Sequence, residues 1–220
     1  MVIPVYNEKG TIKEIVDKIR SVNVDKEIII VDNFSTDGTR QILETLKPDG
    51  VKVILNPENL GKGFSVRKGI DNSVSEFVII QDADLEYDPN DFLKLLRPLE
   101  EGKADIVLGA RFISGHSGLY AHRMGNRFLT WLLNTLFGSN LNDYATCYKI
   151  APKVTFDRLN LKASGFDIEA EIVCKALKNK LRIAEVPISY YPRSYRQGKK
   201  IRWIDGLDAI RSILKYRFSR

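Results

Sequence analysis

Asp82 and Asp84 are separated by one small residue and follow an apolar segment, residues 77–80, and a glutamine. The segment is predicted to be a buried strand, so both carboxylates would stand at its tip. Two carboxylates placed there repel each other unless a cation lies between them or one of them takes up a proton. Hard oxygen ligands suit Mg²⁺ or Mn²⁺, and such an ion can bridge to phosphate oxygens. Glu86 and Asp88 could add ligands or bind water; the alternative interpretation is a polar turn that caps the next helix.

The elements that must position these carboxylates alternate between strand and helix over the first half of the chain. β-Branched segments predict strands at residues 2–6, 27–31, 51–55, 77–80 and 105–108, with helical patterns between them. This alternation predicts an α/β fold with a mostly parallel sheet and helices on both faces. Ligands bind beyond the carboxyl ends of the strands in such sheets. Those ends carry Asn7, Glu8, Asp32, Asn33, Asn56, Asp82, Asp84 and Arg111.

The second half of the chain is less regular. Helical patterns cover residues 123–137 and 166–179, short strands are predicted at 146–150 and 181–190, and an amphipathic helix is predicted at 201–218. On that last helix Trp203, Leu207, Ile210 and Leu214 share one face. The stripe fits packing against the core, and contact with a membrane is the alternative.

The net charge of +6 is unevenly distributed along the 220 residues. Residues 193–220 hold nine Lys or Arg against two Asp, a net charge of +7, whereas residues 1–192 are almost neutral. A basic end attracts phosphates, anionic lipid or nucleic acid, although a solvated helix face is the simpler interpretation. We therefore expect a main domain at 1–192, with a basic loop and an amphipathic helix at 193–220 packed on or beside it.

Composition sets further limits on the class of protein. Cys147 and Cys174 lack the spacing of a metal site or a redox pair, which predicts ordinary residues of a reducing compartment. No apolar segment approaches the ~20 residues needed to span a bilayer, and the predicted strand at the start of the chain argues against a signal peptide. A role at a membrane would be exerted from outside the hydrocarbon.

Seven short segments follow one another along the chain, at residues 2–8, 31–39, 59–63, 82–86, 109–111, 165–166 and 185–188. Together they resemble the family 2 glycosyltransferases with the GT-A fold, near the dolichol-phosphate mannose synthase group and its bacterial relatives. The resemblance implies a nucleotide-diphospho-sugar transferase fold, with a single Rossmann-like, mostly parallel sheet flanked by helices, and a catalytic domain at 1–192. It also implies inverting transfer of a hexose from a GDP- or UDP-sugar to a polyprenyl (dolichyl or undecaprenyl) phosphate, with Mg²⁺ or Mn²⁺ as cofactor.

The resemblance implies that the first two strands bind the nucleoside of the donor. Pro4, Tyr6 and Glu8 resemble the cradle for the base and ribose, and Asp32 resembles a carboxylate that accepts hydrogen bonds from the base. Helix capping is the alternative role for Glu8 and Asp32. Asn33 stands where the family often has a second Asp.

The resemblance implies a metal and diphosphate site beside this cradle. Asp82 and Asp84 resemble the ribose and metal ligands, and Glu86 completes the expected metal set. Arg193 and Lys199 fall where the family has a flexible basic loop over the donor diphosphate. Such a loop would neutralise the departing nucleoside diphosphate together with the metal.

The acceptor site is expected on the other side of the cleft. Arg111 resembles an arginine that faces the acceptor phosphate, and Arg123 and Arg127 are expected to join it, because guanidinium groups suit phosphate oxygens. A phosphate monoester is already anionic near neutral pH and attacks without a strong base. For a hydroxyl acceptor, Asp143 is the candidate base, so the expected catalytic residues are Asp84, Arg111 and Asp143.

Two motifs add detail to the resemblance. Gly61 and Gly63 are expected to allow close backbone packing near the donor. Residues 143–149 keep an Asp but have Cys147 and Tyr148 where the mannose synthase group has Gly-Phe. This departure resembles a bacterial and archaeal subgroup whose sugar and acceptor the sequence leaves unassigned.

Other functions stay open at this stage. A family 2 enzyme with a hydroxyl acceptor, in cell-surface polysaccharide or glycan synthesis, would keep the same donor half. A catalytically silent nucleotide-sugar binder would not need Asp82, Asp84 and Arg111. No motif supports nucleic acid as a partner. We expect a cytoplasmic protein that binds an anionic membrane peripherally at its inner face. A membrane protein is a further candidate partner.

Overall fold

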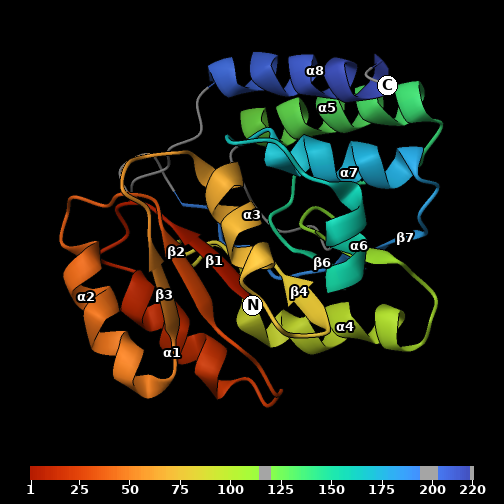
Figure 1. The fold of residues 1–220 in the computed structure, drawn as a ribbon. Coiled ribbons are helices and arrows are strands. Elements are labelled where there is room, and N and C mark those ends of the chain that lie inside the picture. The colour runs from red at the N-terminus through yellow and green to blue at the C-terminus, as the bar shows by residue number, and fades with distance from the viewer. Residues whose placement is uncertain (114–119, 194–202, 219–220) are drawn as a thin grey trace.

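One mixed sheet runs through the computed structural model, which describes residues 1–113, 120–193 and 203–218 but not the side chains of 120–122 and 203–205 (Figure 1). Its strands are β1 (Val2–Val5), β2 (Ile29–Asp32), β3 (Lys52–Leu55), β4 (Phe77–Ile79), β5 (Ile106–Ala110), β6 (Lys149–Pro152) and β7 (Ile183–Pro187). The two parts of the sheet have the orders β1-β2-β3 and β4-β6-β5-β7. The backbone N–H of Gln81 donates to the Val2 carbonyl over 2.9 Å and joins β4 to β1.

The helices cover both faces of the sheet. They are α1 (Ile12–Ser21), α2 (Thr39–Leu46), α3 (Lys62–Asp71), α4 (Phe92–Glu100), α5 (Tyr120–Phe137), α6 (Lys153–Leu159), α7 (Ile168–Lys178) and α8 (Trp203–Phe218), with short 3₁₀ turns at η1 (Lys47–Asp49) and η2 (Pro89–Asp91). In Figure 1, α1 and α4 lie below the strands, and α5, α7 and α8 are stacked above them. The predicted α/β fold is confirmed.

The parallel strands bring the polar residues of the first half together. β2 pairs in parallel with β1 and β3, so that Val5, Asp32 and Leu55 lie side by side. All four residues of β2 are buried, as expected for a strand covered on both faces. The residues that follow β1, β2 and β3 therefore meet at one edge of the sheet, next to the segment that follows β4.

The second half departs from the predicted pattern in two ways. β6 runs antiparallel between β4 and β5, and it begins at Lys149, because the backbone N–H of Cys147 donates to the Tyr87 hydroxyl over 3.0 Å instead of joining a strand. The short helix α6 follows β6 directly and was not predicted, since seven residues are too few to show a clear helical period.

The C-terminal helix α8 packs on α5 and α7 (Figure 1). The face that it buries carries Ile213 and Tyr216, whereas Leu207 and Leu214 are exposed. The predicted packing of the stripe against the core is therefore wrong at Leu207 and Leu214, because the contact with α5 and α7 uses the neighbouring side of the helix. Ile210 is half-buried, and the side chain of Trp203 lies outside the described residues. Within the described ranges, no helix has the length and apolar character needed to cross a membrane.

Candidate active site at the carboxyl edge of the sheet

Asp82 and Asp84 occupy the turn that follows β4, and the structure gives them different partners. The Asp82 carboxylate forms an ion pair with the ammonium group of Lys62 over 2.8 Å. The Asp84 carboxylate accepts a hydrogen bond from the Glu86 backbone N–H over 3.2 Å and pairs with Arg193 over 3.1 Å. The two predicted donor-site carboxylates are thus separated by a single residue but pair with cations that lie far apart in the sequence, Lys62 and Arg193.

Lys62, at the start of α3, belongs to a chain of alternating charges. Besides Asp82, its ammonium group lies 3.0 Å from Glu169, and Glu169 in turn pairs with the fully buried Lys149. Burial opposes ionisation of Asp82, but the charge and hydrogen bond of Lys62 outweigh it, and the pKa of Asp82 falls below its usual value. The same attraction raises the pKa of Lys62 against its burial. Asp82 is therefore held as an anion.

Asp84 has the opposite electrostatic environment. Its burial, together with the negative charges of Asp82 and Glu86, raises its pKa to about 7, although Arg193 works against this shift. A carboxyl with such a pKa is one that an added cation would stabilise in its ionised form. This excess of negative charge is the electrostatic feature expected where a divalent ion binds.

Arg193 connects the segment after β4 to the end of β1. Its guanidinium group donates two hydrogen bonds to the Glu8 carboxylate, over 3.1 and 3.2 Å, and one to Asp84. Its backbone N–H donates to the carboxylate of Glu86 over 2.7 Å. Arg193 therefore stands beside Glu8 and Asp84, two of the predicted donor-site acids.

The predicted metal set of Asp82, Asp84 and Glu86 is not assembled as three converging ligands. Asp82 pairs with Lys62, and Glu86 accepts hydrogen bonds from the Tyr190 hydroxyl and the Arg193 backbone. In the part of the chain that the structure describes, no three His, Cys, Asp or Glu residues are grouped closely enough to hold a metal ion. The carboxylate that fits a divalent ion is Asp84, and Mg²⁺ is commonly held by one or two carboxylates together with phosphate oxygens of the substrate.

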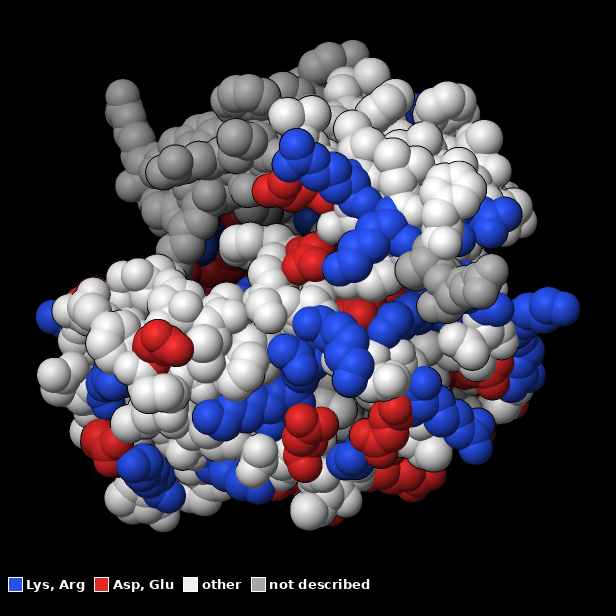
Figure 2. All heavy atoms as spheres, turned by 45° about the horizontal axis from the view of Figure 1, so that its top comes forward, with Lys and Arg blue, Asp and Glu red and all other residues white. Residues whose placement is uncertain are grey.

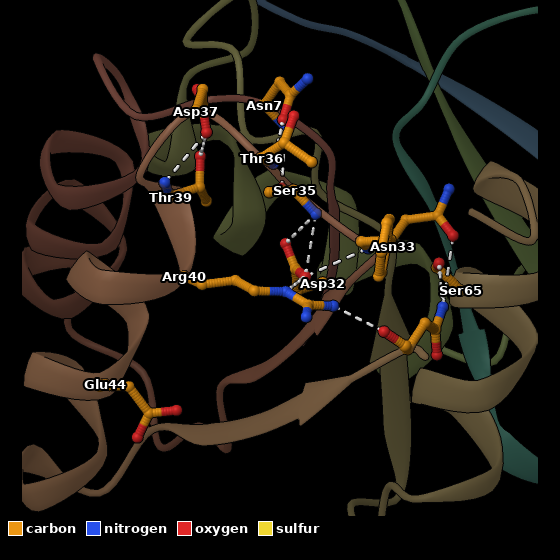
Figure 3. Close-up of polar contacts among 12 residues, drawn as sticks. Asn7, Asp32, Asn33, Ser35, Thr36, Asp37, Thr39, Arg40, Glu44 and Ser65 are labelled. Atoms are coloured by element: carbon orange, nitrogen blue, oxygen red, sulfur yellow. Dashed lines mark hydrogen bonds and ion pairs between the residues drawn. The ribbon is translucent and has the colours of Figure 1, made fainter. Parts of the chain in front are cut away.

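Asp32, the predicted partner of the nucleobase, is fully buried and bonded within the protein (Figure 3). Its carboxylate accepts hydrogen bonds from the backbone N–H groups of Phe34 and Ser35 and from Arg40 Nε, the last over 2.6 Å. Arg40 also donates to the Asn56 carbonyl over 2.6 Å. In this arrangement Asp32 shapes the turn after β2 and ties it to the end of β3 through Arg40. It does not cap a helix, because α2 begins at Thr39 with Gly38 as its N-cap.

The amide of Asn33 extends the same connection toward α3. Its Nδ2 group donates to Asn59 over 2.7 Å, and its Oδ1 atom accepts from the Leu60 backbone over 2.9 Å. Asn33, where the family often has Asp, thus anchors the loop before α3. Of the remaining predicted nucleoside residues, Tyr6 at the same edge is more than one-third exposed, and Pro4 lies within β1. Phe34, which was not predicted, is also more than one-third exposed.

The predicted close packing at Gly61 and Gly63 is confirmed. A Cβ atom on Gly61 would lie 2.2 Å from the Ser164 carbonyl oxygen, and one on Gly63 would lie 2.6 Å from that of Ala163. The backbone N–H of Gly63 donates to the Gly165 carbonyl over 3.1 Å. The absence of side chains brings the start of α3, and with it Lys62, against the segment that leads into α7.

Arg111 and Asp143 form a buried two-point ion pair at the end of β5. The Nε and Nη2 atoms of Arg111 donate to the two carboxylate oxygens of Asp143 over 2.7 and 2.8 Å, and the Arg111 backbone N–H donates over 3.0 Å. Asn126 of α5 donates to the same carboxylate over 3.0 Å. Glu185 of β7 accepts the backbone N–H of Asp143 over 2.8 Å. Asp143 is completely buried, so its carboxylate holds Arg111 in place.

Tyr190 lies between this arginine and the acids after β4. Its hydroxyl donates to Glu86 over 2.9 Å, and the Arg111 guanidinium lies 5.3 Å from the centre of its ring. Phe112 provides a second ring, 5.0 Å from the same guanidinium. A single side chain therefore separates the expected donor acids from the expected acceptor arginine.

The remaining predicted cations are Arg123, Arg127 and Lys199. Arg123 and Arg127 are exposed on α5, and Arg123 lies 6.0 Å from the Phe112 ring. Lys199 falls outside the described residues. Figure 2 shows Lys and Arg side chains across the middle of the face that it presents, with Asp and Glu side chains among them. Such a surface attracts anionic ligands.

Sequence reasoning missed four residues of this site, which are Lys62, Arg40, Glu169 and Tyr190. Lys62 was considered only as the residue between Gly61 and Gly63. Its position at the start of a predicted helix, next to the carboxyl edge of the sheet, could have indicated that it belongs to the site. Nothing in the local sequence indicated Glu169 or Tyr190.

Comparisons with known proteins identify the family of this chain. The family model for glycosyl transferase family 2 matches residues 1–159. Glycosyltransferase AglJ of Haloferax volcanii is 31% identical over 193 residues, which cover 86% of this chain and 62% of that protein. Polyprenol monophosphomannose synthase of Mycolicibacterium smegmatis is 25% identical, with 90% of this chain and 79% of that protein covered.

Two further similarities concern glycan synthesis and the fold. Low-salt glycan biosynthesis hexosyltransferase Agl6 of Haloferax volcanii is 25% identical over 88% of this chain and 48% of its own length. The chain thus spans less than two-thirds of AglJ and about half of Agl6. Glucosyl-3-phosphoglycerate synthase of Mycobacterium tuberculosis, in complex with Mn²⁺, UDP-glucose and phosphoglyceric acid, shares the fold with a TM-score of 0.74 at 21% identity, over 98% of this chain and 78% of that one. By the match of its sequence and the agreement of its fold, this chain belongs to glycosyl transferase family 2.

Proposed function

We propose that this chain transfers a hexose, with inversion, from a UDP- or GDP-sugar to a polyprenyl phosphate, and that it requires Mg²⁺ or Mn²⁺. The observation that carries the proposal is the position of Tyr190, which bonds to Glu86 beside Asp84 and packs under Arg111. This side chain links a site for a cation and diphosphate to a site for a second anion. An enzyme that transfers a sugar from a nucleoside diphosphate to a phosphate acceptor needs both.

On the donor side, the acids after β1 and β4 and the cation Arg193 provide the charges that a nucleoside diphosphate needs. A divalent ion on Asp84 would stabilise the negative charge that develops on the departing diphosphate. Arg193, already beside Glu8 and Asp84, is placed to donate hydrogen bonds to phosphate oxygens. Asp82, kept anionic by Lys62, is available to accept hydrogen bonds from ribose hydroxyls.

On the acceptor side, Arg111 orients the nucleophile. A phosphate oxygen attacks the anomeric carbon, the bond from that carbon to the donor diphosphate breaks, and the bonding electrons leave with the nucleoside diphosphate. The attacking group is already an anion, so no side chain has to remove a proton. Asp143 serves as a positioning residue, since its two-point pair fixes the guanidinium plane of Arg111.

The hydroxyl-acceptor alternative needs a base within reach of the acceptor. Asp143 was the candidate, but its oxygens accept hydrogen bonds from Arg111 and Asn126 within the protein interior. This geometry favours the phosphate acceptor. We place the reaction at the cytoplasmic face of an anionic membrane, where a lipid phosphate would be presented.

The test is a product assay over UDP- and GDP-hexoses with Mn²⁺ or Mg²⁺, each with a short water-soluble polyprenyl phosphate or the matching polyprenol. We expect a sugar-phospho-prenyl product only with the phosphate, and none after chelation by EDTA. Transfer to the alcohol, or full turnover in EDTA, would overturn the proposal.

A further inference from the structure

The outer face of α5 carries apolar side chains that the core does not use. Met124, Phe128 and Trp131 are 46%, 52% and 58% exposed. Their spacing of four and three residues places them on one face of the helix, and the Phe128 and Trp131 rings lie 5.9 Å apart. Three neighbouring large apolar side chains facing solvent mark a contact surface rather than scattered exposure.

This apolar stripe has a basic edge that leads to the acceptor site. Arg127 and Arg123 are exposed along one side of it. Arg123 lies over the Phe112 ring at 6.0 Å, and Arg111 lies over the same ring at 5.0 Å. The guanidinium groups thus continue from the stripe to the arginine that is expected to receive the acceptor phosphate.

The opposite face of α5 fixes the stripe relative to the site. Thr130 and Leu133 are buried, and Asn126 donates a hydrogen bond to Asp143, the partner of Arg111. The helix is therefore a rigid connection, with a packed side that supports the acceptor arginine and an outer side that carries aromatic and cationic groups.

Helix α8 extends the apolar surface next to α5. Arg217 Nε donates to the Leu136 carbonyl over 2.8 Å and joins the ends of the two helices. Leu214 and Phe218 are exposed, and so are Lys215 and Arg217. Figure 2 shows mainly uncharged atoms at its upper right, on the side where α5 and α8 lie in Figure 1.

We propose that the outer face of α5 docks on an anionic bilayer, with Phe128 and Trp131 in the headgroup layer and Arg123 and Arg127 on lipid phosphates. Charge complementarity identifies the bilayer as the binding partner. Aromatic rings flanked by exposed arginines suit a membrane surface with an apolar interior and an anionic headgroup layer. Each cation near such a surface adds attraction. The docking itself does not depend on the proposed function. Only its role does, which is to hold the phosphate of a lipid acceptor at the height of Arg111.

The direct test measures vesicle binding without donor or acceptor. A Trp203→Phe variant leaves Trp131 as the one tryptophan of the chain. We expect its emission to shift to the blue with phosphatidylglycerol-containing vesicles and to be quenched by brominated acyl chains. Flotation with the same vesicles should fall roughly tenfold in the Phe128→Ser/Trp131→Ser double variant.

A matched control and a competing outcome make this test decisive. The Leu93→Ser/Val154→Ser variant removes two side chains that are 51% and 52% exposed on other helices, and it should float like the wild type. Equal flotation of both double variants would overturn the proposal. A dimer of the wild type that the Phe128→Ser/Trp131→Ser change dissociates, without vesicle binding, would assign the face to a second copy of the chain.

A second readout separates this inference from the proposed function. The Phe128→Ser/Trp131→Ser variant should retain turnover with a short, water-soluble polyprenyl phosphate and lose most turnover with a long-chain acceptor embedded in vesicles. Equal turnover of variant and wild type on both acceptors would leave the function standing and refute the docking surface. If the wild type binds vesicles but glycosylates neither acceptor, the docking surface stands and the proposed function is refuted.

Discussion

The guanidinium group of Arg193 lies 3.1 Å from the carboxylate of Asp84, and the two residues are more than one hundred positions apart in the chain. A side-chain cation therefore occupies the surroundings of the carboxylate to which we assign the divalent ion. Because like charges repel, Arg193 and the divalent ion should compete for Asp84. The competition should end when the donor diphosphate binds, since its negative charge can pair with both cations.

Replacing this arginine should strengthen metal binding and weaken catalysis. We expect Arg193→Gln to bind Mn²⁺ roughly five- to tenfold more tightly than the wild type without nucleotide, because a competing charge is removed. Turnover with the donor sugar should fall. Titration calorimetry with MnCl₂ measures the first effect, and Arg182→Gln, which removes a surface pair with Asp105, is the control. An unchanged Mn²⁺ affinity would contradict the competition.

The raised pKa of Asp84 makes a prediction about stability and pH. Between pH 4 and 7 this carboxyl is protonated in the native state and ionised in the unfolded state, so its contribution to stability declines as pH rises through that range. Asp84→Asn should remove this loss and stabilise the metal-free protein at pH 8, on the order of 1–2 kcal/mol.

Thermal melts at two pH values measure this effect. The melting temperature of Asp84→Asn should exceed that of the wild type by roughly 2–8 °C at pH 8, and by much less at pH 5. Asp25→Asn, at an exposed acid outside the site, serves as the control. A variant that melts lower than the wild type at pH 8 would show that the ion pair with Arg193 outweighs burial and repulsion.

Lys62 should control the ionisation of Asp82. In Lys62→Met the carboxylate loses the cation that lowers its pKa, so it should take up a proton at a higher pH than in the wild type. The acid limb of donor binding, followed by calorimetry with the nucleotide sugar, should move to higher pH. Lys62→Arg, which keeps the charge, should restore it in part. A pH profile of Lys62→Met that coincides with the wild type would remove Lys62 from the donor site.

Variants of Arg111 and Asp143 should distinguish whether Asp143 positions Arg111 or acts as a general base. Asp143→Ala should destabilise the fold by about 3–5 kcal/mol, because it leaves a buried arginine without its partner. Arg111→Lys keeps the charge but loses the two-point geometry, and it should raise KM for the acceptor phosphate with little change in KM for the donor. Urea unfolding and steady-state kinetics measure these effects. A large drop in kcat for Asp143→Asn, with unchanged stability and acceptor KM, would favour the base.

Close packing at Gly63 should be sensitive to a single methyl group. Gly63→Ala places its Cβ atom 2.6 Å from the Ala163 carbonyl oxygen and should lower the free energy of unfolding by about 1–3 kcal/mol. Gly10→Ala is the matched control, since nothing lies within 4 Å of the added atom, and its effect should stay within about 0.5 kcal/mol. Urea unfolding of both variants that gives equal midpoints would contradict the packing argument.

The alternation of apolar strand segments and helical segments by itself determined the α/β fold and the edge of the sheet at which the candidate site lies. The first three residues of β2 are apolar and the fourth is Asp32, and such a strand is expected inside a sheet that is covered on both faces. Because parallel strands end at a common edge, the polar residues after β1, β2 and β4 had to come together there. The motif at Asp82 and Asp84 and the glycines at 61 and 63 could be identified for the same reason.

Only the tertiary structure decided which charge meets which. Arg193 reaches Glu8 across 185 positions, Lys62 rather than a third acid faces Asp82, and Asp143 pairs with Arg111 instead of remaining open to solvent. The exposure of Leu207 and Leu214 on α8, and of the aromatic rings on α5, likewise depended on how the two helices pack. Periodicity records which side of an element is apolar, whereas the energy of an ion pair depends on distance and burial in three dimensions, and neither is encoded in local sequence.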